Sequence, residues 1–414
     1  MPRRTVSASR EFFAALPVAE ALAGFRPQRR TGVESVLRDD ALGRVPTSAV
    51  TSGQPLPGFA RSTVDGYAVR AADTYGAGDG LPAYLDVLGR VRMGSMPELS
   101  VRPGAALQIP TGAAIPDGAD AVVMVEYTQV TMAGAVEVTR PVAIGDGIVR
   151  ADEDVAAGGA LAPAGRPLRP QDLGLLAAAG VTELKVRARP RVAIVSTGDE
   201  VVPSDTQRLA AGQVRDATAS ALSALVTRAG GVPDYRGIVP DDQEALTTTL
   251  TEAVAEADLV VVSAGSSVGA RDETTAAVEA LGDASVFCHG LAIKPGKPTL
   301  LAEVAGVPVL GLPGNPLSAL VVFRMVGLPV LRLVGGIEVP PPEPTVPATL
   351  SRPLASAAGR LDVVQVTLRD GQATPIFGHS ALLSLLTTAD GYVVVPEPAT
   401  GLDAGAVVTV TLYA

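Results

Sequence analysis

Residues 191–200 read RVAIVSTGDE, an apolar run that ends in a polar turn containing glycine. The run Val192–Ser196 has the length and β-branched composition of a buried strand. Further apolar runs follow it and alternate with helical patterns, which predicts a parallel sheet wrapped by helices. The expected strands are Val192–Ser196, Tyr235–Val239, Leu259–Val262 and Pro308–Leu312, and the expected helices are Ala217–Ala229, Gln243–Ala255, Glu273–Leu281 and Pro316–Leu328.

The sequence on either side of this region has a different pattern. Two segments before it, Val18–Arg44 and Pro170–Ala179, read as helical, and Gly180 follows the second where a helix is expected to stop. Short β-type runs lie between these segments, and more follow the proline-rich linker Val339–Pro347. The expected strands are Tyr84–Val91, Ala121–Tyr127, Ala135–Thr139, Leu361–Leu368, Gly391–Val395 and Ala406–Leu412.

These patterns predict an α/β multidomain chain, since 414 residues are enough for two to four domains. We expect a discontinuous helical linking domain over residues 1–52 and 147–188, with a mostly-β domain inserted at 53–146. A central doubly wound α/β domain should span 189–335, and a C-terminal β-barrel-like domain 336–414. The very apolar segment 307–334 is interrupted by prolines, Asn315 and Arg324, so it is interpreted as domain core and not as a membrane span.

Composition narrows the classes of function. The net charge of −10 argues against a general nucleic-acid binder, which needs a basic face. The chain has one cysteine, Cys288, and two histidines, too few for a zinc centre built from these residues. Carboxylate oxygens would have to hold any metal ion, and such ligands suit Mg²⁺.

Glycine-containing loops follow three of the expected strands, at what should be one edge of the sheet. They are Ser196–Glu200, Ser263–Gly269 and Leu312–Pro316. Ligands bind outside the carboxyl ends of the strands in such sheets, and glycine lets backbone N–H groups approach an anion. Each loop alone is typical of a tight turn, but three together favour a binding site. The candidate ligand-binding residues are Thr197, Gly198, Gly265, Ser266, Ser267, Gly269, Pro313, Gly314 and Asn315.

Charged residues accompany these loops. Lys294 and Lys297 stand in the proline-flanked turn IKPGKP, which suits an oxyanion or phosphate, although a solvated basic turn is the alternative. Carboxylates are also expected near the same strand ends, and a divalent cation would relieve the repulsion between their charges. These carboxylates are Asp199, Glu200, Asp241, Asp242 and Asp272. Asp241 and Asp242 could instead cap the following helix. The residues alone therefore predict a pocket for a small phosphate-bearing ligand with Mg²⁺, without the P-loop or G-x-G-x-x-G patterns.

The order of several motifs resembles the molybdenum insertase family, that is, MoeA-type molybdopterin molybdenumtransferases and the gephyrin E domain. The first motif is STVDGYAVR at 62–70, and the resemblance runs from about Val18 to the C-terminus. The remaining motifs are TGA at 111–113, GADAVV at 118–123, Glu153-Asp154, STGDE at 196–200, SVG at 267–269, KPGKP at 294–298 and LPGNP at 312–316.

The resemblance implies that the chain inserts molybdate into adenylylated molybdopterin, releases AMP and forms molybdenum cofactor. It implies a cytoplasmic homodimer whose cleft lies between the central domain and the Asp65-bearing β domain of the other subunit. Molybdopterin adenylyltransferase and apo-molybdoenzymes are the implied protein partners, with neither nucleic acid nor membrane. The implied catalytic residues are Asp65, Glu200, Asp242, Asp272, Lys294 and Lys297. The residues implied to bind Mg²⁺ are Asp65, Asp154, Glu200, Asp242 and Asp272. Ser380 or Ser384 matches a serine of the family's last domain.

The chain departs from the family pattern at several positions, most of them in the N-terminal half and at the rim of the cleft. These are Arg61, Gln108, Val149, Thr218 and Glu273. Loss of arginine and asparagine donors would weaken substrate orientation. Two alternatives therefore stay open: a catalytically weak paralogue that binds molybdopterin or acts as a scaffold, and a nucleotide-binding α/β enzyme of another class.

Overall fold

The computed structural model describes residues 15–263 and 268–413. The chain divides into two compact units, each described by itself. The first contains the described residues up to Ser48, a short segment Ala164–Arg169 and the chain from Leu184 onward. The second contains Ala49–Pro163 and Pro170–Glu183. The four domain limits expected from the sequence stay a prediction.

A six-stranded sheet forms the centre of the first unit, in the order β16-β13-β17-β21-β20-β18. The first four strands run parallel, as the alternating sequence pattern predicted. The last two strands, β18 and β20, are antiparallel and were not predicted. The strands are β13 (Arg191–Thr197), β16 (Val232–Val239), β17 (Leu259–Ser263), β18 (Ala284–His289), β20 (Leu300–Val304) and β21 (Val307–Leu312).

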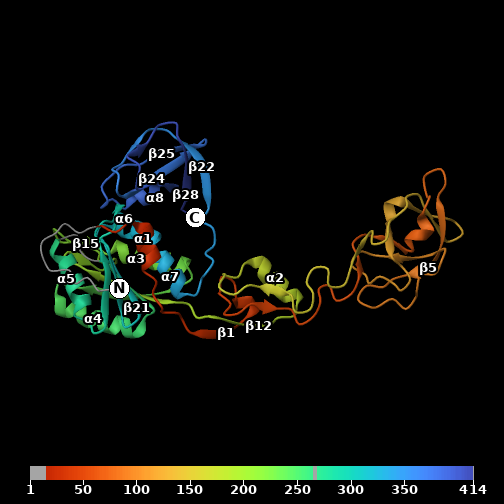
Figure 1. The fold of residues 1–414 in the computed structure, drawn as a ribbon, viewed down its shortest axis with the longest axis horizontal. Helices are drawn as coiled ribbons and strands as arrows, with labels where there is room; N and C mark the ends of the chain where they lie inside the picture. Colours follow the sequence, from red (N-terminus) through yellow and green to blue (C-terminus); the bar gives the residue numbers. More distant parts are fainter. Residues whose placement is uncertain (1–14, 264–267, 414) are drawn as a thin grey trace, which may run out of the picture. The chain divides into compact units, whose positions relative to one another are not determined.

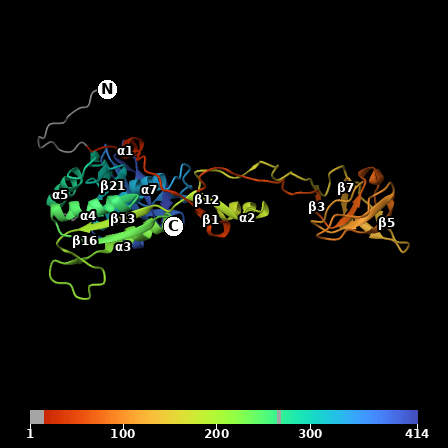
Figure 2. The same ribbon diagram turned by 90° about the horizontal axis from the view of Figure 1, so that it is seen from below.

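Helices cover both faces of this sheet, and Figure 2 shows α3 and α4 on opposite sides of it. Successive residues of a strand point to opposite faces, so Ile194 packs into one core cluster with Leu222 of α3. Its neighbour Val195 packs into another cluster with Leu250 of α4. The helices are α3 (Ala217–Arg228), α4 (Gln243–Glu256), α5 (Val268–Glu279), α6 (Pro316–Val322) and α7 (Leu328–Val334), with a π turn η4 (Phe323–Gly327) joining the last two.

The helix from Pro316 to Val334 is long and apolar enough to cross a membrane, but 72% of its most apolar window is buried inside the fold. Phe323, Val326 and Val330 on it are almost fully inaccessible to solvent. It is therefore the core helix of the α/β domain, which confirms the interpretation of this segment as core.

The C-terminal region is a closed five-stranded barrel, drawn in blue in Figure 1. Its order is β24-β25-β22-β28-β26, and β26 pairs back onto β24 to close it. A short strand β19 (Ile293–Lys294) pairs with β24, which places Lys294 opposite Asp362. The barrel strands are β22 (Thr345–Leu350), β24 (Leu361–Arg369), β25 (Gln372–Pro375), β26 (Gly391–Val395) and β28 (Val407–Leu412), accompanied by β23 (Leu354–Ala355), β27 (Gly401–Leu402) and α8 (Ser384–Thr388).

The predicted helix Val18–Arg44 is wrong over most of its length. Helix α1 (Val18–Gly24) ends at a glycine, and Pro27, which has no N–H to donate, follows soon after. The chain then forms strand β1 (Val33–Leu37), which pairs with β12 (Glu183–Arg187), and the turn η1 (Arg38–Asp40). Two further short strands of the first unit, β14 (Val201–Val202) and β15 (Val214–Arg215), pair with each other.

The second unit contains a mixed six-stranded sheet in the order β7-β4-β6-β5-β9-β8. The three β runs predicted here are confirmed, with 121–127 ending as a strand at Met124 and continuing as a 3₁₀ turn. The sheet strands are β4 (Gly66–Val69), β5 (Ala83–Arg90), β6 (Ala105–Ile109), β7 (Ala121–Met124), β8 (Thr128–Val130) and β9 (Ala135–Val138).

Short elements complete the second unit. Helix α2 (Pro170–Ala178) begins at the predicted proline, and Gly180 follows it. The other elements are β2 (Val50–Thr51) with β11 (Ala160–Ala162), β3 (Arg61–Ser62) with β10 (Ile148–Val149), and the 3₁₀ turns η2 (Ala71–Thr74) and η3 (Val125–Tyr127).

Candidate functional site

The carboxyl ends of β13, β17 and β21 meet at one edge of the sheet, since Ser196 is opposite Ser263 and Ser263 is opposite Leu312. A cavity of about 430 Å³ opens there. It is lined by four of the residues predicted to bind ligand or act in catalysis, Thr197, Glu200, Gly314 and Asn315. Gly198 lies in the loop between the first two, and its N–H points to the carbonyl of Val239.

A buried carboxylate, Asp216, also lines this cavity. Its Oδ2 accepts hydrogen bonds from the hydroxyls of Ser196 (2.6 Å) and Tyr235 (2.8 Å). Its Oδ1 accepts the N–H of Ala219 (3.0 Å), so Asp216 is also the N-cap of α3. Burial and the neighbouring Asp216 carboxylate raise the pKa of Tyr235, which keeps its hydroxyl protonated as a donor. Asp216 thus joins β13, β16 and α3.

Asp216 was not among the predicted site residues. A signal for it was present, because aspartate immediately before a helix is a preferred cap. Its contacts with Ser196 and Tyr235 were not visible in the sequence, since they join residues 20 and 19 positions apart.

The acidic residues near the strand ends have different partners. The Oδ1 atom of Asp242 accepts the N–H of Ala245 (2.8 Å) and caps α4, as one alternative predicted. Asp241 instead donates its own N–H to Oδ1 of Asp199 (3.2 Å), and its Oδ1 is buried with no hydrogen-bond partner among the described residues. Burial, then the charges of Asp199 and Glu200, raise the pKa of the Asp241 carboxyl. Its ionised form is therefore disfavoured unless a cation is near.

These carboxylates have donor chemistry that fits Mg²⁺. A cation near Asp241 would give its Oδ1 a partner and would lower the raised pKa of its carboxyl. Among the described side chains, however, no three of the ligating types form a group that could hold a metal ion by themselves. The backbone of Asp272 and Gly269 lies in α5, while the predicted residues Gly265, Ser266 and Ser267 lie outside the described residues.

A second cavity, of about 800 Å³, is lined by both lysines of the IKPGKP turn together with Pro313, Asn315 and Ser380. Asn315 lines this cavity and the smaller one, so the two adjoin at that residue. The chain has only three lysines, and two of them lie in this turn. Gly296 between them has φ +123°, and a Cβ there would lie 2.2 Å from the Val322 side chain, so the turn requires glycine.

The barrel contributes further groups to the larger cavity. Nδ2 of Asn315 donates to Oγ of Ser380 (2.9 Å), and the N–H of Leu317 donates to the Ser380 carbonyl (3.1 Å). Of the two serines considered from the sequence, Ser380 lines the cavity. Ser384, which begins α8, is not among its described lining residues.

Arg360 is a cavity residue that the sequence analysis missed. Its guanidinium bonds both oxygens of Asp362 (2.8 and 3.4 Å), a side chain that also faces Lys294 Nζ at 3.9 Å. Asp362 is buried, with 3% of its surface exposed. Arg360 and Lys294 thus share one buried carboxylate at the wall of the cavity, which leaves the three groups with a net positive charge.

The second unit carries the remaining predicted residues. Asp65 is exposed, and its Oδ1 accepts the N–H of Thr111 (2.8 Å) from the TGA motif. The next residue, Gly66, lies so close to β7 that a Cβ would be 1.8 Å from the Val123 carbonyl. Asp154 is exposed, and its backbone N–H bonds the carbonyl of Leu56. The structure therefore orients Asp65 through two of the sequence motifs.

An α/β sheet with glycine loops and paired lysines, followed by a small barrel, defines a multidomain α/β protein with a candidate anion-binding site. Residues 16–180 match the MoeA N-terminal region (domain I and II), residues 193–333 the probable molybdopterin binding domain, and residues 347–413 the MoeA C-terminal region (domain IV). The chain belongs to the MoeA family of molybdopterin molybdenumtransferases.

Individual relatives agree with this assignment. The molybdopterin molybdenumtransferase 2 of Mycobacterium tuberculosis is 35% identical over 396 residues, covering 94% of this chain and 95% of the relative. The molybdopterin molybdenumtransferase of Bacillus subtilis is 31% identical over 408 residues, covering 96% and 94%. A crystal structure of the molybdopterin biosynthesis MoeA protein from Pyrococcus horikoshii matches with a TM-score of 0.84 at 30% identity, covering 96% of this chain and all of the other.

Proposed function

We propose that the chain is a molybdopterin molybdenumtransferase that acts on adenylylated molybdopterin and molybdate, releases AMP and forms molybdenum cofactor. The observation that carries this proposal is the pair of adjoining cavities. One is bounded by the strand-end loops with Thr197 and Glu200, the other by Lys294 and Lys297, and Asn315 borders both. A ligand with a neutral polar end and a strongly anionic end suits this arrangement.

The two lysines and Arg360 are the groups that bind anions. Lys294 and Lys297 are exposed to the cavity on a turn that Gly296 and the flanking prolines restrict, so the backbone that carries their ammonium groups needs little ordering on binding. A phosphate or molybdate oxygen there accepts charge-assisted hydrogen bonds. As charge develops on the departing AMP phosphate, the same ammonium groups stabilise it.

The loop residues position the remainder of the substrate. Asp216 holds Ser196 and thereby the strand end from which Thr197 and Gly198 extend. The amide of Asn315 is oriented by its hydrogen bond to Ser380, which leaves its carbonyl oxygen able to accept from the ligand. Glu200 lines the same cavity and supplies a carboxylate that can orient a polar group or accept a proton.

We propose that Mg²⁺ is the cofactor and that Glu200, Asp242 and Asp272 would hold it. Asp241 is added to this predicted set because the pKa of its carboxyl is raised and its Oδ1 has no hydrogen-bond partner among the described residues. When bound, the ion would neutralise phosphate charge. The proposal includes a cytoplasmic homodimer in which Asp65 and Asp154 of one subunit complete the cleft of the other. A molybdopterin adenylyltransferase would supply the substrate, and apo-molybdoenzymes would receive the product.

The test is turnover with a matched lysine control. Purified protein is incubated with adenylylated molybdopterin, molybdate and Mg²⁺, and AMP release is quantified together with activation of an apo-molybdoenzyme. Lys297→Ala should lower the rate by about 100-fold, the usual effect of removing one group that stabilises developing charge. Lys185→Ala, at an exposed position that lines neither cavity, should retain the wild-type rate.

The same assay decides between catalysis and binding alone. A wild-type chain that binds the substrate tightly and releases no AMP would overturn the transferase proposal and favour a molybdopterin-binding paralogue. Thr218, one of the departures from the family pattern, is buried and lines the smaller cavity, so Thr218→Asn is the informative reversion. A gain in turnover in that variant would assign the loss of activity to this position.

A further inference from the structure

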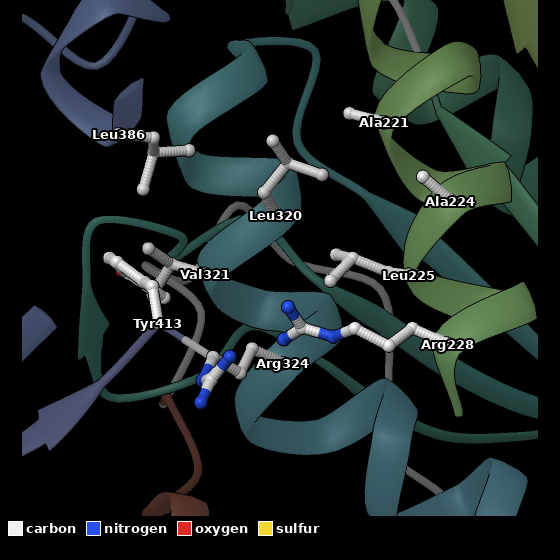
Figure 3. Close-up of a pocket in the computed structure, with 9 residues that line it drawn as sticks. All are labelled: Ala221, Ala224, Leu225, Arg228, Leu320, Val321, Arg324, Leu386 and Tyr413. Carbon is white, nitrogen blue, oxygen red and sulfur yellow. The ribbon is translucent and has the colours of Figure 1, made fainter. Parts of the chain in front are cut away.

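A third pocket, of about 290 Å³, lies between α3 and the core helix (Figure 3). None of its nine described lining residues borders either of those cavities. Its walls are mostly apolar, with two arginines among them. The lining residues are Ala221, Ala224, Leu225 and Arg228 of α3, Leu320, Val321 and Arg324 of α6 and η4, Leu386 of α8, and Tyr413.

The hollow follows from small residues on one face of α3. Ala221, Ala224, Leu225 and Arg228 are three, four and seven positions apart, so they share one side of the helix. The two alanines leave space that longer side chains would fill. Across from them the core helix widens into a π turn at Phe323–Gly327, and such turns occur frequently at functional sites.

One of the two arginines is already partly engaged. The Arg324 side chain is 9% exposed; its Nη2 donates to the Leu412 carbonyl (3.2 Å), and Glu343 lies 3.8 Å from that nitrogen. Its guanidinium also lies 5.1 Å from the centre of the Tyr413 ring. In the part of the chain that the structure describes, no hydrogen bond of its Nη1 is found.

The other arginine, Arg228, is the last residue of α3. Arg228 is exposed, and no hydrogen bond or ion pair of its guanidinium is found among residues 15–263 and 268–413. Figure 3 shows its side chain reaching from the end of α3 toward the core helix, at the end of the pocket where Arg324 also lies. An unpaired guanidinium beside apolar walls is a strong anion site, because the walls reduce competition by water.

We propose that this pocket binds a small organic anion with an aromatic or aliphatic body. The body fills the space between Ala221, Ala224 and Leu320, and the carboxylate, sulfonate or phosphate group bonds Arg228. The volume is at the low end of small-molecule sites, so it suits a small ligand. Charge complementarity selects an anion, because the lining residues include two guanidinium groups and no carboxylate.

The test uses anilinonaphthalene sulfonate, whose fluorescence rises when its apolar body leaves water and whose sulfonate supplies the anion. The full chain should bind it saturably at one site. Arg228→Ala should weaken binding about 10-fold, the lower range for a hydrogen bond to a charged group. Ala224→Phe should abolish binding by filling the pocket. Arg208→Ala, which removes an exposed arginine outside the pocket, should change the dissociation constant less than 2-fold, within the range for surface substitutions.

The neutral parent compound phenylnaphthylamine separates the two parts of the proposal. It should bind more weakly than the sulfonate and be insensitive to Arg228→Ala. Wild-type affinity for the sulfonate in Ala224→Phe would show that the dye binds elsewhere and would overturn the site. Full affinity for the sulfonate in Arg228→Ala would overturn the proposal that Arg228 binds the anionic group. Both substituted positions are exposed, and circular dichroism melting curves verify that each variant is folded.

Discussion

Asn315 Nδ2 donates a hydrogen bond to Ser380 Oγ across 2.9 Å, joining the loop after β21 to the segment that precedes α8 in the barrel region. A second bond, from the N–H of Leu317 to the Ser380 carbonyl, reinforces the same contact. Residues 65 positions apart thereby form one wall of the larger cavity. The barrel is therefore part of the candidate site and not only an appended domain.

Ser380→Ala should lower turnover more than it lowers stability. The substitution removes the acceptor that orients Asn315 but keeps the backbone bond to Leu317. The free energy of unfolding should therefore fall by only about 1 kcal/mol. We expect kcat to fall at least 10-fold, because the Asn315 amide loses its orientation. Urea denaturation and AMP release measure the two effects. A fall in stability with unchanged kcat would show that the contact is structural only.

Tyr235→Phe and Asp216→Ala should differ in their effect on stability. Tyr235→Phe removes one donor to Asp216 and should lower the free energy of unfolding by about 1 kcal/mol. Asp216→Ala removes the shared acceptor and the α3 cap, leaving the Ser196 hydroxyl buried, and should cost about 3 kcal/mol. Denaturant titration of both variants tests this order. Equal effects would mean that the tyrosine bond dominates the network.

The parallel strands could be predicted from the sequence because each is a short apolar run, and three of the four end in a glycine turn. Strand β17 differs from the prediction by one residue, and helix α3 begins at the predicted Ala217. Strand β16 begins three residues before the predicted Tyr235, since Val232 and Pro233 pair with β13 at the edge of the sheet.

Elements that depend on distant pairing could not be predicted. Val33–Leu37 was included in the predicted helix Val18–Arg44, yet it forms a strand whose partner β12 lies about 150 positions away. Arg360 was missed for the same reason. It reaches the cavity only because Lys294 of β19 pairs with Asp362 of the barrel, a register that no local pattern reveals.

Asp241→Asn should increase stability at neutral pH. Because the pKa of this carboxyl is raised in the folded chain, the folded state binds the proton more tightly than the unfolded state. The wild type therefore loses stability as pH rises from the carboxyl's ordinary pKa of 3.8 through its folded-state pKa, and regains it on acidification. The asparagine variant should lack this dependence.

Mg²⁺ offers a second measurement on the same residue. The ion should raise the melting temperature of the wild type at pH 7.5 and have a smaller effect on Asp241→Asn, since the unpartnered Oδ1 is replaced by a neutral group. Asp205→Asn, an exposed aspartate that lines neither cavity, is the control. Equal shifts in both variants would exclude Asp241 from cation binding.

Gly66→Ala should destabilise the β sheet of the second unit. A Cβ at this position would lie 1.8 Å from the Val123 carbonyl, so β4 and β7 must separate. The expected loss is about 3 kcal/mol, the upper range for overpacking. Gly53→Ala, where no atom of the described residues other than the chain neighbours lies within 4 Å of the added Cβ, should change stability by less than about 1 kcal/mol. Thermal unfolding of the full chain compares the two, and equal melting temperatures would contradict the close approach.

The single cysteine should be unreactive at physiological pH. Burial raises the pKa of the Cys288 thiol to about 11, with a smaller opposing contribution from its backbone contact with Leu301. The thiolate is the nucleophile in alkylation, so at pH 8 only a small fraction of the thiol can react. Iodoacetamide labelling followed by mass spectrometry should be slow at pH 8 in the folded chain and fast in urea. Between pH 8 and pH 10 the folded-state rate should rise about 10-fold per pH unit, because each unit below the pKa changes the thiolate fraction by that factor. A rate that levels off near pH 9 would show that the thiol titrates like an exposed one and that its contacts in β18 do not shield it.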